Sequence, residues 1–148
     1  MSKIIQKYLR YLRYEKNYSL HTEISYSKDL SQFEDFLNRH CEGISLLDVD
    51  GDMVRRWMTL LMESGMSSRS VNRKLSSLKS FYRYLLRIGE IDSTPMARIV
   101  GPKANKPLPS FANDSDLEFV LEETIGDGDF EAMRNHTVFE LLYMTGMR

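Results

Sequence analysis

Apolar residues recur along this sequence at intervals of three and four, and no stretch alternates long enough to indicate a strand. The pattern predicts an all-α protein. Helices are expected from about residue 3 to 16, from about 20 to 39, from about 52 to 64, and from 68 to 87. Ser19 and the Ser67-Ser68 pair supply N-caps, and Gly65 and Gly89 act as stop signals. Four helices of these lengths can enclose one core.

A different composition begins near residue 100. The stretch 101–110 contains three of the four prolines and two lysines. Proline lacks a backbone donor and disfavours helix in the residue before it, so 101–112 is interpreted as an extended linker. Asn113 with Asp116 then resembles a capping box for a helix reaching residue 124 or 125, and a last helix is expected from about 131 to 144. We therefore predict a helical domain over 1–100, a linker over 101–112 and a second segment over 113–148.

Length and composition narrow the class of protein. A chain of 148 residues that is 42% hydrophobic can form one domain plus the start of another. It has no apolar run of about 18 residues and no apolar signal-peptide core, so a cytoplasmic protein is expected. The single Cys41 and three scattered histidines predict neither a disulfide nor a metal site, and no cofactor is expected.

The net charge of −1 averages two unlike parts. Residues 1–107 carry 18 Lys and Arg against 12 Asp and Glu, whereas residues 108–148 carry 2 against 9. Such a break suggests that the two parts have different partners, and the basic part is the candidate to bind a polyanion.

The fourth predicted helix carries the clearest functional pattern. Between residues 64 and 89 there are six basic residues and no acidic one. At helical spacing, one face holds Val71, Leu75, Leu78, Tyr82 and Leu85, and the opposite face holds Arg69, Arg73, Ser76, Ser80, Arg83 and Arg87. Arginine pairs with phosphate or guanine, and small hydroxyl residues allow close approach to DNA. The alternative is a solvated face, but such faces usually carry glutamates four residues from lysines, and none occurs here.

The second predicted helix has a similar outer face. Its inner face holds Tyr26, Leu30, Phe33 and Leu37, and its outer face holds His21, Ser25, Lys28 and Gln32. Thr22 lies near the helix start, where a hydroxyl and a free amide can bind a phosphate. The many tyrosines are assigned to core packing, and no function is assigned to them.

Four segments together resemble the Xer-type tyrosine recombinases and related phage and mobile-element integrases. The second helix matches through Tyr18-Ser19-Leu20-His21-Thr22, Tyr26, Asp29-Leu30, Phe33 and Phe36-Leu37. The fourth matches almost throughout residues 65–82, Pro102-Lys103 and Leu108-Pro109 look like the family's linker, and Leu141 to Arg148 looks like the motif that ends in its first catalytic arginine. The resemblance spans nearly the whole chain.

This resemblance implies a helical core-binding domain, a linker and the start of a catalytic domain, which in the family form a clamp around duplex DNA. It implies that DNA contacts come from the second and fourth helices. The residues so assigned are His21, Thr22, Ser25, Lys28, Arg69, Ser70, Asn72, Arg73, Ser76 and Ser77. The family joins DNA strands through a 3'-phosphotyrosyl intermediate, works as a tetramer and needs no nucleotide or metal.

Arg148 would be the first catalytic arginine, whose guanidinium stabilises charge on the phosphate oxygens. The second arginine in its His-x-x-Arg motif, the lysine, the further His or Trp and the tyrosine nucleophile have no counterpart in the sequence. The chain alone is therefore expected to be inactive in cleavage. Two other readings stay open: a non-catalytic helical DNA-binding regulator or adaptor, and a helical module that binds only proteins.

Overall fold

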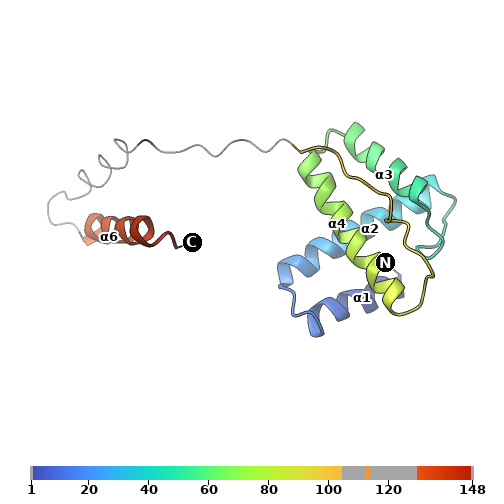
Figure 1. The fold of residues 1–148 in the computed structure, drawn as a ribbon, viewed down its shortest axis with the longest axis horizontal. Helices are drawn as coiled ribbons and strands as arrows, with labels where there is room; N and C mark the ends of the chain where they lie inside the picture. Colours follow the sequence, from blue (N-terminus) through green and yellow to red (C-terminus); the bar gives the residue numbers. More distant parts are fainter. Residues whose placement is uncertain (1, 105–112, 114–129, 148) are drawn as a thin grey trace. The chain divides into compact units, whose positions relative to one another are not determined.

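The computed structural model describes residues 2–104, 113 and 130–147. The described helices are α1 (Lys3–Tyr14), α2 (Leu20–His40), α3 (Gly51–Glu63), α4 (Ser68–Arg87) and α6 (Phe130–Thr145), shown in Figure 1. No described residue lies in a strand, so the all-α prediction is confirmed. The chain divides into two compact units, residues 1–105 and 106–148, and each is described by itself.

The helix boundaries follow from local capping. The Ser19 side chain accepts from the Thr22 amide at 3.3 Å, and the Ser67 side chain accepts from the Ser70 amide at the same distance. Both N-caps were predicted. Gly65 (φ +81°) and Gly89 (φ +71°) follow α3 and α4 in the left-handed region, which glycine adopts without strain.

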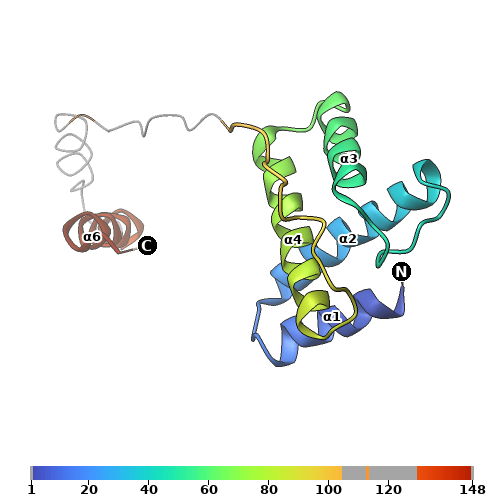
Figure 2. The same ribbon diagram turned by 45° about the vertical axis from the view of Figure 1, so that its right-hand side comes forward.

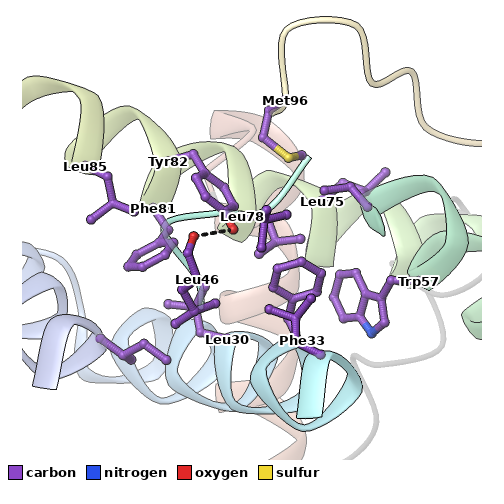
Figure 3. Packing of buried hydrophobic residues seen from close by; sticks show 14 of the residues in the cluster. Leu30, Phe33, Leu46, Trp57, Leu75, Leu78, Phe81, Tyr82, Leu85 and Met96 are labelled. Carbon is purple, nitrogen blue, oxygen red and sulfur yellow. Dashed lines mark hydrogen bonds between the residues drawn. The ribbon is translucent and has the colours of Figure 1, made fainter. Parts of the chain in front are cut away.

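The core of the first unit is formed by the inner faces of α1 to α4. Phe33 and Trp57 meet edge to face, with ring centroids 5.0 Å apart. The Tyr82 hydroxyl donates to the carbonyl oxygen of Leu46 at 3.1 Å, as the dashed line in Figure 3 shows, so this buried phenol is paired. The predicted inner face of α4 is confirmed, because Val71, Leu75, Leu78, Tyr82 and Leu85 are all buried.

Helix α4 is the central element of this unit. It packs against α2 and α3, and α1 packs against α2. The ring of Tyr11 in α1 stacks on that of Tyr84 in α4, with centroids 4.8 Å apart. After α4 the chain turns and residues 91–104 return along it without forming a helix (Figure 2). Met96 and Ile99 in this segment are buried, which ties it to the core.

Helix α6 is the described part of the second unit. It ends at Thr145, one residue after the predicted end, and Gly146 follows with φ +63°, in the left-handed region that ends many helices. Its side chains include no buried residue, and Val138, Leu141, Leu142 and Tyr143 are each at least 44% exposed. The helix expected after Asn113, most of the predicted linker and Arg148 lie outside the described residues. Within the described part of the chain, no helix is long and apolar enough to cross a membrane.

Candidate nucleic-acid interface

Helices α2 and α4 are joined by a buried ion cluster, named here the α2–α4 clamp and formed by Asp29, Arg73 and Lys74. The Asp29 carboxylate is completely buried. It accepts two parallel hydrogen bonds from the Arg73 guanidinium, at 2.7 and 2.8 Å, and a third from the Lys74 ammonium at 2.9 Å. Lys74 also donates to the side chain of Gln32. A buried carboxylate is stable only when its oxygens are paired in this way.

The clamp has a net positive charge and an outward side. Two cations surround one carboxylate, and the Arg73 side chain is 49% exposed whereas that of Lys74 is 6% exposed. Arg73 therefore fixes α4 against α2 and also presents part of its guanidinium to solvent. Because the fork is held by two bonds, its orientation is set before any ligand arrives.

The exposed residues around the clamp include most of those predicted from sequence. His21, Lys28, Arg69 and Ser76 are exposed, and Thr22, Ser25 and Ser70 are half-buried. One turn before Asp29 lies Ser25, and one turn before Arg73 lies Arg69, so residues from both helices share the surface near their contact.

Three residues of the predicted outer surface have other roles. Ser77 is fully buried and its hydroxyl donates to the carbonyl oxygen of Lys74, so the expected DNA contact is corrected to a core position. The Asn72 side-chain amide donates to the carbonyl oxygen of Pro102 at 2.8 Å, so this side chain holds the returning segment. Ser80 is half-buried and accepts a hydrogen bond from Tyr8. Helical periodicity places these positions at the border between the inner and outer faces of α4. It does not show which neighbouring segment of the chain covers them.

The clamp itself was missed in the sequence analysis. Asp29 falls between Tyr26 and Phe33, within the inward stripe of α2, and Lys74 adjoins Leu75 on the inward side of α4. An acidic residue and a basic residue inside two apolar stripes are a signal for a buried pair, because neither charge is stable there alone.

Tyr26 lies beside the clamp. Burial raises the pKa of its hydroxyl, and the nearby Tyr18 and Asp29 raise it further, against the opposite effect of Arg73. The phenol stays protonated at neutral pH and is available as a hydrogen-bond donor.

Among the described residues, His, Cys, Asp and Glu form no group of three that could hold a metal ion. The surface is instead a set of arginine, lysine and hydroxyl groups on two crossing helices. These groups suit a phosphate backbone.

Comparison with known proteins identifies the fold that carries this surface. Residues 5–89 match the phage integrase N-terminal SAM-like domain. The chain belongs to this family. In the integrase domain so defined, the matched range covers α1 through α4 and ends at Gly89.

Full-length relatives of this integrase domain include tyrosine recombinases. The chain is 36% identical over 144 residues to Tyrosine recombinase XerC of Halalkalibacterium halodurans, an alignment covering 97% of this chain and 47% of the relative. It is 34% identical over 148 residues to XerC of Staphylococcus aureus strain MSSA476, covering all of this chain and 49% of the relative. The chain thus spans about half the length of the curated relatives it matches.

A solved structure shares the fold. The Tn1549 transposon integrase (residues 82–397) in complex with circular intermediate DNA has a TM-score of 0.64 to this chain at 17% identity. The alignment covers all of this chain and 47% of that one.

Proposed function

We propose that this chain binds duplex DNA through the exposed residues of α2 and α4 around the α2–α4 clamp. The observation that carries the proposal is the position of Arg73, which is fixed by two bonds to Asp29 yet half exposed beside Arg69. An arginine already ordered in the free protein loses little conformational entropy when it meets a phosphate or a guanine. Lys28 and His21 extend the polar surface along α2.

We expect some residues of this surface to contact DNA phosphates and others to contact base edges. Ser70, near the amino terminus of α4, and Thr22, near that of α2, have amides close to helix ends that favour phosphate. Both amides are already capped by serine side chains, and the two hydroxyls are also hydrogen-bonded to those serines at 3.0 Å. Because the Ser70 oxygen accepts from Ser67, its own proton is the group left to donate to a DNA phosphate. Arg69 and Ser76 lie on the exposed side, where they can approach base edges.

DNA binding would serve strand exchange in the whole protein. The relatives named above are tyrosine recombinases, and this chain corresponds to about half of their length. We propose that the full protein cleaves and rejoins DNA as a tetramer in the cytoplasm, with Arg148 stabilising the phosphate charge and the tyrosine nucleophile supplied outside this sequence.

Fluorescence anisotropy with a labelled duplex tests the binding proposal. The chain is expected to bind with an affinity that falls steeply with salt, and Arg69→Ala is expected to flatten the slope of log K against log salt by about one. Arg39→Ala is the matched control, because Arg39 is an exposed arginine in the last turn of α2. No binding at low salt would favour a protein-interaction module and overturn the proposal.

A further inference from the structure

A second cationic site lies away from the clamp, where the end of α1 and the turn after it meet the second half of α4. This feature, named here the α1–α4 groove, has a volume of about 270 Å³. Its lining includes Lys16, Tyr18, Ser80, Arg83, Tyr84 and Arg87, and none of the residues that line it is acidic. Three cations around one small groove favour an anion.

The backbone fixes the Lys16 side of the groove. The amides of Glu15 and Lys16 both donate to the carbonyl oxygen of Tyr11, at 3.0 and 3.2 Å, and the Tyr18 amide donates to that of Leu12 at 3.1 Å. Asn17 completes the turn with φ +51°, a conformation that asparagine tolerates better than most residues. These three main-chain bonds fix the backbone of the turn that carries Lys16.

Stacking on aromatic rings orders the Arg87 side chain, which also lines the groove. The Arg87 guanidinium carbon lies 4.2 Å from the centroid of the Tyr11 ring and 5.8 Å from that of Tyr84. A guanidinium stacked on a ring keeps its N–H edge free for an acceptor. Its contact with Glu15, at 3.6 Å, joins two side chains that are at least half exposed, so solvent screens it.

Ser80, another residue that lines the groove, has an oriented hydroxyl. Tyr8 donates to the Ser80 oxygen at 2.7 Å, and burial raises the pKa of Tyr8 far above its ordinary value, so the phenol keeps the proton that it donates. The Ser80 proton must then point elsewhere. Ser76 and Ser77 donate to main-chain carbonyls, but within the described part of the chain Ser80 shows no such bond. Its hydroxyl is available to an anion in the groove.

We propose that the α1–α4 groove binds one phosphate of a nucleic-acid backbone, with Lys16, Arg83 and Arg87 neutralising it and Ser80 donating a hydrogen bond. This inference rests on the proposed function and adds a phosphate contact to it. Phosphate oxygens accept from arginine forks and serine hydroxyls, which is the donor set assembled here.

The position of the groove favours a duplex over a free ion. The Tyr18 ring at its edge meets the Tyr26 ring, with centroids 6.4 Å apart, and Tyr26 borders the clamp. The groove therefore continues the proposed surface. Ten residues separate Arg73 from Arg83, about 15 Å along a helix at 1.5 Å per residue, which is close to the major-groove width of about 12 Å. The two sites can thus meet phosphates on opposite sides of one major groove.

Salt-dependent binding of the full chain to a labelled duplex tests the inference. Arg83→Ala is expected to weaken binding roughly five- to tenfold at about 0.1 M salt and to reduce the salt slope by about one. Arg39→Ala should change neither. An Arg83→Ala variant that binds like the unaltered chain, while Arg69→Ala is weakened, would overturn the groove and leave the proposed function intact. If the unaltered chain binds no duplex, the proposed function is wrong, and the phosphate contact in the groove is wrong with it.

NMR titration shows whether the groove binds the phosphates of a DNA duplex or free inorganic phosphate. Adding duplex should shift the Ser80 amide and the Arg83 side-chain resonance, and inorganic phosphate at the same phosphate concentration should shift them far less. Equal shifts from the free ion, or none from duplex, would contradict the proposal. Arg87→Lys keeps the charge but loses the planar stacking on Tyr11, so it should weaken duplex binding although the net charge is unchanged.

Discussion

The Asn72 side-chain amide donates to the carbonyl oxygen of Pro102 at 2.8 Å, across thirty residues of sequence. The bond ties the end of the returning segment to the same helix that carries Arg69 and Arg73. Gly101 makes this approach possible, because a Cβ there would lie 1.8 Å from the Asn72 side-chain oxygen. The exit of the chain from the first unit is thus coupled to the proposed DNA-binding helix.

Gly101→Ala is expected to break this attachment. The added methyl group cannot share space with Asn72, so either the side chain rotates or the segment 99–104 moves away from α4. We expect a loss of about 1 to 3 kcal/mol in the free energy of unfolding, measured by urea denaturation. Amide exchange near Val100 should accelerate at the same time. Ala104→Gly, an exposed change in the same segment, is the control and should leave the exchange of Val100 unaltered.

Asp29→Ala tests the clamp as a structural element. It leaves the ammonium of the buried Lys74 without its carboxylate, and removal of one partner from a buried pair costs about 3 to 5 kcal/mol. Because Arg73 is half exposed and can turn to water, the lower end of that range is expected.

The double variant Asp29→Leu, Lys74→Met removes both buried charges and should recover much of the lost stability. It would still free Arg73 from its fixed orientation, so duplex binding should remain weakened although the fold is restored. A double variant that binds duplex as well as the unaltered chain would show that the clamp has no role in orienting Arg73.

Arg69→Ala and Arg73→Ala should differ in their effect on stability, because only Arg73 contributes to the fold as well as to the proposed DNA contact. Arg69 is exposed, so its loss should weaken duplex binding with little change in stability. Loss of Arg73 should lower both, because it also removes two bonds to Asp29. Arg73→Lys keeps one charge but not the paired geometry, and should fall between the two in both measurements.

Sequence patterns predicted most of the fold and only part of the candidate site. Apolar periodicity and capping residues fix where helices begin and end, and Ser19, Ser67, Gly65 and Gly89 have the predicted capping roles. Periodicity describes one helix at a time, however. Whether Ser77 faces solvent or core, and whether Arg73 pairs with DNA or with Asp29, depends on how α2 meets α4.

The α1–α4 groove is a second site that helical periodicity alone does not predict. Arg83 and Arg87 stood out in the sequence because no acid accompanies them, but Lys16 and Tyr8 are more than sixty residues away and joined them only through packing. The burial of Lys74 has the same origin, since it depends on a carboxylate from another helix.

Alkaline pH should unfold the first unit through two buried tyrosines. Burial raises the pKa of both Tyr8 and Tyr82 well above the ordinary value of 10.0, so the folded state keeps protons that the unfolded chain releases. Stability from these groups is complete below about pH 10 and falls as pH rises further, by about 1.4 kcal/mol per pH unit for each tyrosine. Tyr82→Phe and Tyr8→Phe should each reduce that slope by up to about 1.4 kcal/mol per pH unit between pH 10 and 12, as urea denaturation at a series of pH values would measure. Tyr14→Phe, at an exposed position, is the control and should leave the slope unchanged. An equal slope in all three variants would mean that neither buried phenol stays protonated in the folded chain.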